Sequence, residues 1–325
     1  MKEKISTERI EWVDIAKGIL IVLVVMGHVK SSYSSSGLLQ DSIVLNYSNA
    51  FAYSFHMAAF FFLSGLLFSR KHSKKSLSAR IIDKLIAYGI PYIIFSVVYW
   101  VMQILMASSS NHSIAMTDIL KIFLFPFSYL WFVYALMLMQ VIQELLADRK
   151  ATAFGIAIVL FAVNCVLETQ LDGTVYSDLI ICDFMSNYIY FAAGVFLGEK
   201  LVAAIGAIRH KKIASIAFSM VLVVGAACKL YFPIGYVGML FLAGLGTCTV
   251  IVVSQTITSN KIIEYLGRMS MPIYLLHGYV ISFTRIVLTK LHVPVGGGYT
   301  AIAVYCPWSK HSINCYQDCG CFAVH

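Results

Sequence analysis

Nine long apolar runs divide this chain and limit what it can fold into. They lie at about residues 15–29, 50–68, 84–106, 122–146, 152–167, 179–198, 213–230, 235–254 and 270–290. Most approach the roughly 20 residues that an α-helix needs to cross the hydrocarbon core of a bilayer. Because a lipid-exposed backbone must satisfy its own hydrogen bonds, and because the runs are long and unbroken, we expect helices rather than a β-barrel.

The composition supports a membrane protein. Only 12% of the residues are charged and 59% are hydrophobic, whereas a soluble domain carries about 25% charged residues. We therefore expect an all-α polytopic membrane protein, a bundle of nine to ten transmembrane helices without a soluble domain. The net charge of +8 would suggest nucleic acid in a soluble protein. Here the basic residues lie mainly in short loops, so we expect no nucleic-acid partner and interpret the charge as a signal for membrane orientation.

The distribution of basic residues predicts a cytoplasmic N-terminus. If the runs cross the membrane alternately, the outer side receives Lys30, Lys121, Lys229, Arg285 and Lys290, and Lys310 lies in the tail. The other 18 of the 24 Lys and Arg residues then fall on the inner side. This asymmetry follows the rule that short cytoplasmic loops are rich in Lys and Arg. Pro126 lies inside the fourth apolar run. Because proline interrupts a helix, we expect a short interfacial helix to precede the true fourth span.

The last residues break the apolar pattern. We divide the chain into a transmembrane domain, residues 1–298, and an atypical tail, residues 299–325, where a tenth span is expected but Pro307 and a polar stretch interrupt it. We interpret the tail as aberrant or as a truncated last span. The alternative is a metal site formed by Cys315, Cys319 and Cys321 with a nearby histidine. Their C-x3-C-x-C spacing is not a usual zinc pair, so we expect no metal.

The first apolar run carries three ionisable groups on one helical face. From Lys17 to His28 is eleven residues, or about 1100°, which is within about 20° of three full turns. Asp14 lies about 40° from the same line. The helical rise separates Lys17 from His28 by roughly 16 Å. The alternative is an Asp14–Lys17 pair at the membrane edge with an interfacial histidine. Aligned ionisable groups inside a bundle more often mark a functional path.

The second run begins with a histidine at the same membrane side. It runs from outside to inside, so His56 starts near the outer face and is expected to approach His28 across a helix–helix contact. Ser64 and Gly65 further along are small and predict close helix packing.

These segments resemble a known family. DIAKGILIVLVVMGH followed by SFHMAAFFFLSG is similar to the acyltransferase-3 family of membrane-bound acyltransferases, and most similar to its fucose 4-O-acetylase-like branch. Lys17 and His28 match the family's motif of a basic residue, ten residues and a histidine, although many members have arginine at the first position. The segments YLWFVYALML at 129–138 and LGRMSMPIYLLH at 266–277 resemble later family motifs. The resemblance covers residues 9–280.

The resemblance implies transfer of an acyl group, usually acetyl, from cytoplasmic acetyl-CoA to a hydroxyl of a carbohydrate or glycolipid acceptor such as an exopolysaccharide. The protein would then be a multi-pass protein of the inner (plasma) membrane. A sugar hydroxyl needs a general base, for which histidine has the best-placed pKa. We expect His28 to be this base, with His56 as the rival.

The remaining roles concern the donor. Lys17 is expected to hold acyl-CoA at the inner end, and Asp14 to orient Lys17. His277 is expected to line the donor channel, or else to be a histidine hydrogen-bonded between helices. Asp183 is a candidate for orienting His28 or His56. The alternative function is a transporter of a glycan or small anion, in which His and Asp relay protons, but the chain shows no inverted repeat.

Overall fold

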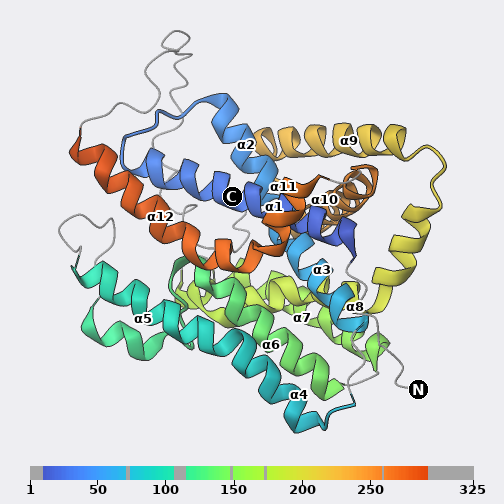
Figure 1. Cartoon of the computed structure of the whole chain (residues 1–325), viewed down its shortest axis with the longest axis horizontal. Helices are drawn as coiled ribbons and strands as arrows, with labels where there is room; N and C mark the ends of the chain where they lie inside the picture. Colours follow the sequence, from blue (N-terminus) through green and yellow to red (C-terminus); the bar gives the residue numbers. More distant parts are fainter. Residues whose placement is uncertain are drawn as a thin grey trace.

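The computed structural model describes residues 10–70, 74–105, 115–146, 149–171, 174–257 and 260–291. Helices make up most of these residues (Figure 1). The longer helices are α1 Glu11–Ser35, α2 Ile43–Tyr53, α3 His56–Arg70, α4 Leu77–Lys84, α5 Ile90–Leu105, α6 Trp131–Leu146, α7 Lys150–Gln170, α8 Ile180–Gly206, α9 Lys211–Tyr231, α10 Tyr236–Thr256, α11 Lys261–Arg268 and α12 Ser270–Lys290. The short ones are the π-helix η1 Leu85–Gly89 and the 3₁₀ helices η3 Met116–Lys121, η4 Ser128–Leu130 and η5 Val175–Asp178.

Nine helical segments within these described ranges are long and apolar enough to cross a membrane. They are α1, α2 with α3, α4 with α5, η4 with α6, α7, α8, α9, α10 and α12. They coincide with the nine apolar runs of the sequence, which confirms the prediction of an all-helical polytopic membrane protein. The tail beyond residue 291, with the expected tenth span and the cysteines at 315, 319 and 321, lies outside the described residues.

Three spans differ in detail from the sequence prediction. The first is a 25-residue helix, longer than the apolar run, because its charged ends also remain helical. The second bends between α2 and α3, where Ser54 and Phe55 form a turn. The third contains the π-helix η1, a feature that commonly interrupts α-helices at functional sites. The fourth begins only at Ser128, after Pro126 and the 3₁₀ helix η3, as the proline predicted.

Glycines bring α3 and α8 into backbone contact at the centre of the bundle. A Cβ on Gly65 would lie 2.0 Å from the carbonyl oxygen of Phe191, and one on Gly194 would lie 2.1 Å from that of Phe62. Neither position therefore accepts a larger residue without separating the helices. Small residues allow this approach in membranes, where close packing drives helix association. The packing role predicted for Gly65 follows this geometry.

Helices α5 and α9 lie at the edge of the bundle (Figure 1). Only Leu222 and Ala226 are buried along α9, and only Tyr92 and Ser96 along α5. Many of their other apolar side chains are exposed, such as Ile94 on α5 and Met220 on α9, which suits helices in contact with lipid.

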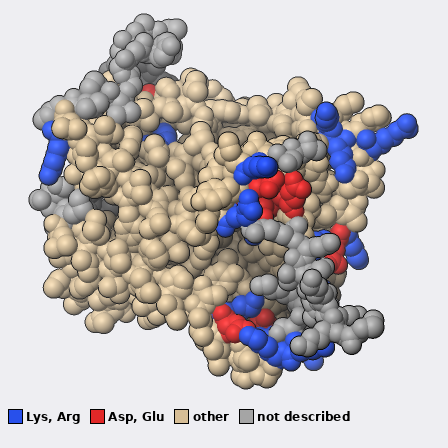
Figure 2. Space-filling view, in the orientation of Figure 1, with Lys and Arg blue, Asp and Glu red and all other residues tan. Residues whose placement is uncertain are grey.

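Basic side chains gather at one end of the molecule. On the face shown in Figure 2, most Lys and Arg atoms lie at the right-hand end, where α4 begins and α8 meets α9 in Figure 1. Several of them are paired there; for example, the Arg80 Nε lies 2.7 Å from the Glu144 Oε2, and the Arg70 Nε lies 3.7 Å from the Glu199 Oε1. The basic residues that the sequence analysis assigned to the inner side thus gather at one end of the folded molecule. The positive-inside rule assigns this end to the cytoplasm.

Candidate active site

Two histidines from the first and last described spans face each other. The imidazole rings of His28 on α1 and His277 on α12 have centroids 4.9 Å apart. The ring of Tyr129, from η4, lies 6.0 Å from that of His28 and 4.5 Å from that of His277. Helices α1 and α12 run side by side, so each histidine is presented by a continuous helix (Figure 1).

Further aromatic rings complete this group. The ring of Tyr53, at the end of α2, lies 6.3 Å from His28 and 5.0 Å from His56. The ring of Tyr274 lies 5.5 Å from His277. We call these six residues the histidine–tyrosine cluster: His28, Tyr53, His56, Tyr129, Tyr274 and His277.

A glycine beside each of two histidines makes room for a tyrosine ring. A Cβ on Gly278, next to His277, would lie 2.1 Å from the Tyr129 Cε1 atom. A Cβ on Gly27, next to His28, would lie 2.6 Å from the Tyr53 Cε2 atom. Real Cβ contacts are longer, so only glycine lets the two tyrosines pack directly against the helices that carry the histidines.

The backbone before Tyr129 is strained. Ser128 has φ 45°, in the left-handed region that residues other than glycine rarely occupy. Such strain costs of order 1–3 kcal/mol and persists only where the surrounding structure imposes it. Here it turns the chain into α6 and directs Tyr129 toward α12, where its hydroxyl donates to the Leu275 carbonyl oxygen at 3.2 Å. The Tyr274 hydroxyl in turn donates to the carbonyl oxygen of Tyr129.

Hydrogen bonds fix the orientation of two imidazoles. The Nδ1–H of His277 donates to the Tyr274 carbonyl oxygen at 2.6 Å, and that of His56 donates to the Ala52 carbonyl oxygen at 2.6 Å. A proton on Nδ1 leaves Nε2 with a lone pair. The Nε2 of His277 is buried and has no hydrogen-bond partner in the described part of the chain. A buried acceptor without a partner is unfavourable, so this nitrogen is suited to a ligand's proton or to protonated His28.

Exposure separates the three histidines. His56 is 2% exposed and His277 is 5% exposed, whereas His28 is half-buried. Of the three, His28 is therefore the one that a substrate reaches most easily. The chain turns at Ser54 and Phe55, and the ring of Tyr53 lies 5.0 Å from that of His56 and 6.3 Å from that of His28. Tyr53 is thus a shared neighbour of the two histidines, and the direct approach of His56 to His28 stays a prediction.

Lys17 and Asp14 lie at the other end of α1, against α11. A Cβ on Gly18 would lie 2.1 Å from the Ile263 carbonyl oxygen, and one on Gly267 would lie 1.7 Å from that of Asp14. The two helices therefore touch through their backbones beside Lys17, which is half-buried. Since α1 is continuous from Glu11 to Ser35, Lys17 stays roughly 16 Å from His28 along the helix axis.

The sequence hypothesis assigned His277 to the donor together with Lys17. The structure instead places His277 beside His28, so it lies at the end of α1 that is roughly 16 Å from Lys17. Asp183 is buried in the first turn of α8, and its proposed contact with His28 or His56 stays a prediction. Within the described ranges, no group of three or more His, Cys, Asp or Glu residues is arranged to hold a metal ion.

The sequence interpretation did not single out the tyrosines and glycines of this site. Tyr129 and Tyr274 stand inside the two later segments quoted as family-like, and Tyr53 stands three residues before His56. The family-like segments therefore already contained Tyr129 and Tyr274, but only the fold shows that these tyrosines lie beside the histidines.

The described helices define a polytopic membrane protein with a histidine–tyrosine cluster inside its bundle. A family model described as an acyltransferase domain, that of the acyltransferase-3 family, matches residues 10–309. The chain belongs to this family and is a membrane acyltransferase. The match extends beyond residue 298, the domain boundary predicted from the sequence. Neither the curated proteins nor the solved structures contain a match to this chain.

Proposed function

We propose that this protein transfers an acetyl group from cytoplasmic acetyl-CoA to a hydroxyl of a cell-surface or lipid-linked carbohydrate, in the plasma membrane. The observation that carries the proposal is the position of His28. It is half-buried, beside the buried His277, on the same helix as a basic residue roughly 16 Å nearer the basic end of the molecule. One helix thus offers a cation to an anionic donor and a base to a hydroxyl.

In the proposed step, His28 accepts the proton of the acceptor hydroxyl while the hydroxyl oxygen attacks the thioester carbonyl carbon. A new carbon–oxygen bond forms, the carbon–sulfur bond breaks, and the sulfur leaves with the electron pair. Protonated His28 then returns its proton to the sulfur, so the products are the ester and free CoA. General acid–base catalysis of this kind typically contributes about 10²–10⁴ in rate.

The neighbours of His28 suit this step. The His277 Nε2 has no partner among the described residues, and its lone pair stabilises a proton on the facing imidazole by accepting a hydrogen bond when the rings approach. The surrounding tyrosine rings exclude water, and a water-poor site protects the thioester from hydrolysis. At the other end, Lys17 contributes a positive charge for the phosphates of CoA, and Asp14 orients it.

The test uses membranes that contain the full chain. Acetyl-CoA labelled in the acetyl group is supplied on the cytoplasmic side, and label is followed into surface or lipid-linked carbohydrate. We expect label in ester linkage, released by mild alkali, with loss of signal in His28→Ala. Movement of a glycan or anion across the membrane without any acetylation would instead support a transporter.

Compositional analysis of surface carbohydrates from cells with and without the protein identifies the acceptor. We expect O-acetyl groups on one sugar to disappear with the protein. An unchanged O-acetyl content, together with CoA-independent activity, would overturn the proposed donor and acceptor classes.

A further inference from the structure

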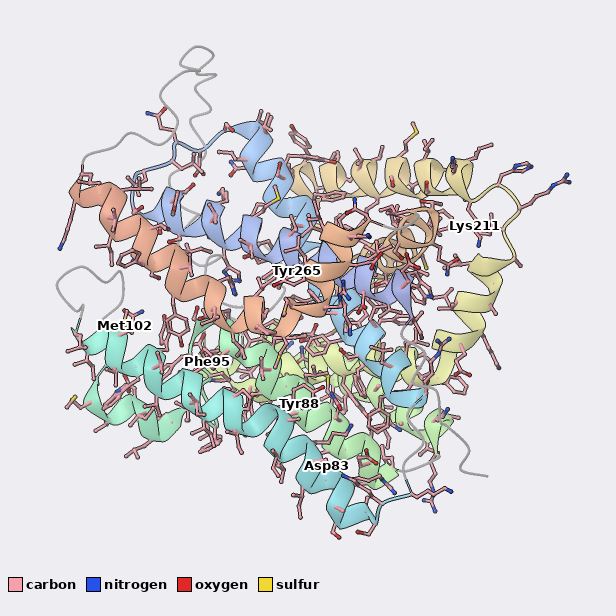
Figure 3. All side chains as sticks on the ribbon, in the orientation of Figure 1. Asp83, Tyr88, Phe95, Met102, Lys211 and Tyr265 are labelled. Atoms are coloured by element: carbon pink, nitrogen blue, oxygen red, sulfur yellow. The ribbon has the colours of Figure 1, made fainter. Side chains whose placement is uncertain are left out.

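A basic pocket lies far from the histidine–tyrosine cluster, where α8 meets α9. It has a volume of about 770 Å³. It is lined by the residues that connect the two helices and by the end of α10, namely Gly206, Ala207, Ile208, Arg209, His210, Lys211, Lys212, Ile213, Gln255 and Thr256. The labelled Lys211 in Figure 3 marks its position at the start of α9.

The charges of this pocket have one sign. Arg209, Lys211 and Lys212 are cationic, His210 is titratable, and no lining residue is acidic. The ion pairs found among the described residues involve none of the three cations. The first backbone N–H groups of α9 also point to this end, and His210 provides no side-chain cap for them. Cations combined with free N–H groups at a helix start favour a phosphate.

An apolar stripe leads away from the pocket along α9. Ile213 lines the pocket and is 66% exposed, and Met220 and Val224 are 64% and 61% exposed. Seven and eleven residues after Ile213, both lie within about 20° of its direction on the helix. Since α9 is at the edge of the bundle, this stripe faces lipid. A ligand with a phosphate head and apolar chains matches the pocket and the stripe together.

The position of the pocket separates it from the donor site. Its lining residue Ile208 packs with Trp12 against the same small core cluster. Trp12 is sixteen residues before His28, or about 24 Å along α1, whereas Lys17 is about 16 Å away. A donor whose thioester lies at His28 has its phosphates near Lys17. On the side of Trp12, the pocket thus lies about 7.5 Å further along α1 from His28 than Lys17 does, which places it for a phosphate group other than the one that Lys17 is proposed to hold.

We propose that the pocket between α8, α9 and the end of α10 binds the headgroup of an anionic glycerophospholipid of the cytoplasmic leaflet, with its acyl chains along Ile213, Met220 and Val224. Basic pockets between spans on this side commonly hold anionic headgroups. Bound lipid would fix the α8–α9 connection at the membrane surface. The separation of this pocket from the donor site rests on the proposed acetyl-CoA donor, whereas the lipid site itself does not depend on the acceptor.

Native mass spectrometry of the full chain tests this proposal, with phosphatidylglycerol in an excess of phosphatidylcholine as the probe. We expect the protein to retain phosphatidylglycerol selectively. The variant Arg209→Gln, Lys211→Gln and Lys212→Gln should lose at least about tenfold in apparent affinity for it, since each cation contributes to attraction at the surface. The charge-preserving variant Arg209→Lys, Lys211→Arg and Lys212→Arg should retain the lipid, which separates lost charge from lost folding.

A matched control removes the same charges elsewhere on the basic end, with Lys74→Gln, Arg149→Gln and Lys150→Gln. It should keep the selectively bound lipid. Equal loss in both variants, or retention in the pocket variant, would overturn the proposal. Displacement of the lipid by added CoA would also overturn it, because the pocket would then be part of the donor site. Binding of soluble glycerol phosphate as tightly as the full lipid would show a free phosphate site without a role for the α9 stripe, and would equally refute a lipid site.

Discussion

His28 and His277 lie in facing positions, with ring centroids 4.9 Å apart, although they come from the first and the last spans that the structure describes. The Nδ1 of His277 is held by the Tyr274 carbonyl oxygen, and its Nε2 is buried without a partner in the described residues. His28 is the more exposed ring of the pair. This arrangement favours a division of roles in which His28 contacts the substrate and His277 stabilises His28.

Replacement of His28 tests the assignment of the base. We expect His28→Ala to reduce acyl transfer by about 10²–10⁴, the usual contribution of general acid–base catalysis, while protein level and membrane insertion stay normal. His56→Ala should cost less, because His56 is only 2% exposed and is less accessible to substrate than His28. The measurement is the initial rate of label transfer in membranes. Near-normal turnover in His28→Ala with an inactive His56→Ala would move the base to α3.

Replacement of His277 decides between a role beside the base and a role in the donor channel. If His277 supports His28, His277→Phe should lower kcat by about tenfold or more, within the range of proton-transfer effects, and leave the KM for acetyl-CoA nearly unchanged. A ring of similar size keeps the packing against Tyr129. Steady-state kinetics with varied acetyl-CoA give both constants. A raised KM with normal kcat would restore the donor interpretation made from the sequence.

Gly278 should be sensitive to a single methyl group. In Gly278→Ala the new Cβ would overlap the Tyr129 ring, 2.1 Å from its Cε1 atom, and the ring or α12 must shift by about 1 Å. A displacement of this size at a catalytic site can cost about 10²-fold in rate. The matched control is Gly244→Ala on α10, where no atom of the described residues outside the local helix lies within 4 Å of the added Cβ. The control should keep full activity, and helix propensity gives it up to about 1 kcal/mol of added stability. Equal activity of both variants would show that Tyr129 need not be held in place.

The apolar runs of the sequence predicted the nine spans found among the described residues, because membrane crossing depends on length and hydropathy, which are local properties. The alignment of Lys17 with His28 was also predictable, since one regular helix carries both. The pairing of His28 with His277 was not, because it depends on how α12 packs against α1. The same holds for Gly278, whose role arises from Tyr129 on another element. The bend before His56 was missed because Ser54 and Phe55 carry no proline or glycine signal.

Lys17 is expected to serve the donor. Lys17→Arg should retain much of the activity, since arginine also binds phosphate well. Lys17→Met should raise the KM for acetyl-CoA by about tenfold to 100-fold, the usual value of a hydrogen bond to a charged group, with a smaller effect on kcat. An unchanged KM in Lys17→Met would show that the lysine only anchors α1 at the membrane surface.

The basic end of the molecule should face the cytoplasm. The segment before α4 is exposed there and carries Lys74 and Lys75, whereas the segment between α1 and α2 lies at the other end of α1 and includes Gln40. Single cysteines at Ser78 and Gln40 report the two sides, since both positions are exposed. In intact cells a membrane-impermeant maleimide should label Gln40→Cys and spare Ser78→Cys, and permeabilised cells should label both. The unsubstituted chain measures the background from its own cysteines. Labelling of Ser78→Cys in intact cells, with Gln40→Cys protected, would reverse the topology and place the Lys17 end of α1 outside, where it could not meet cytoplasmic acetyl-CoA.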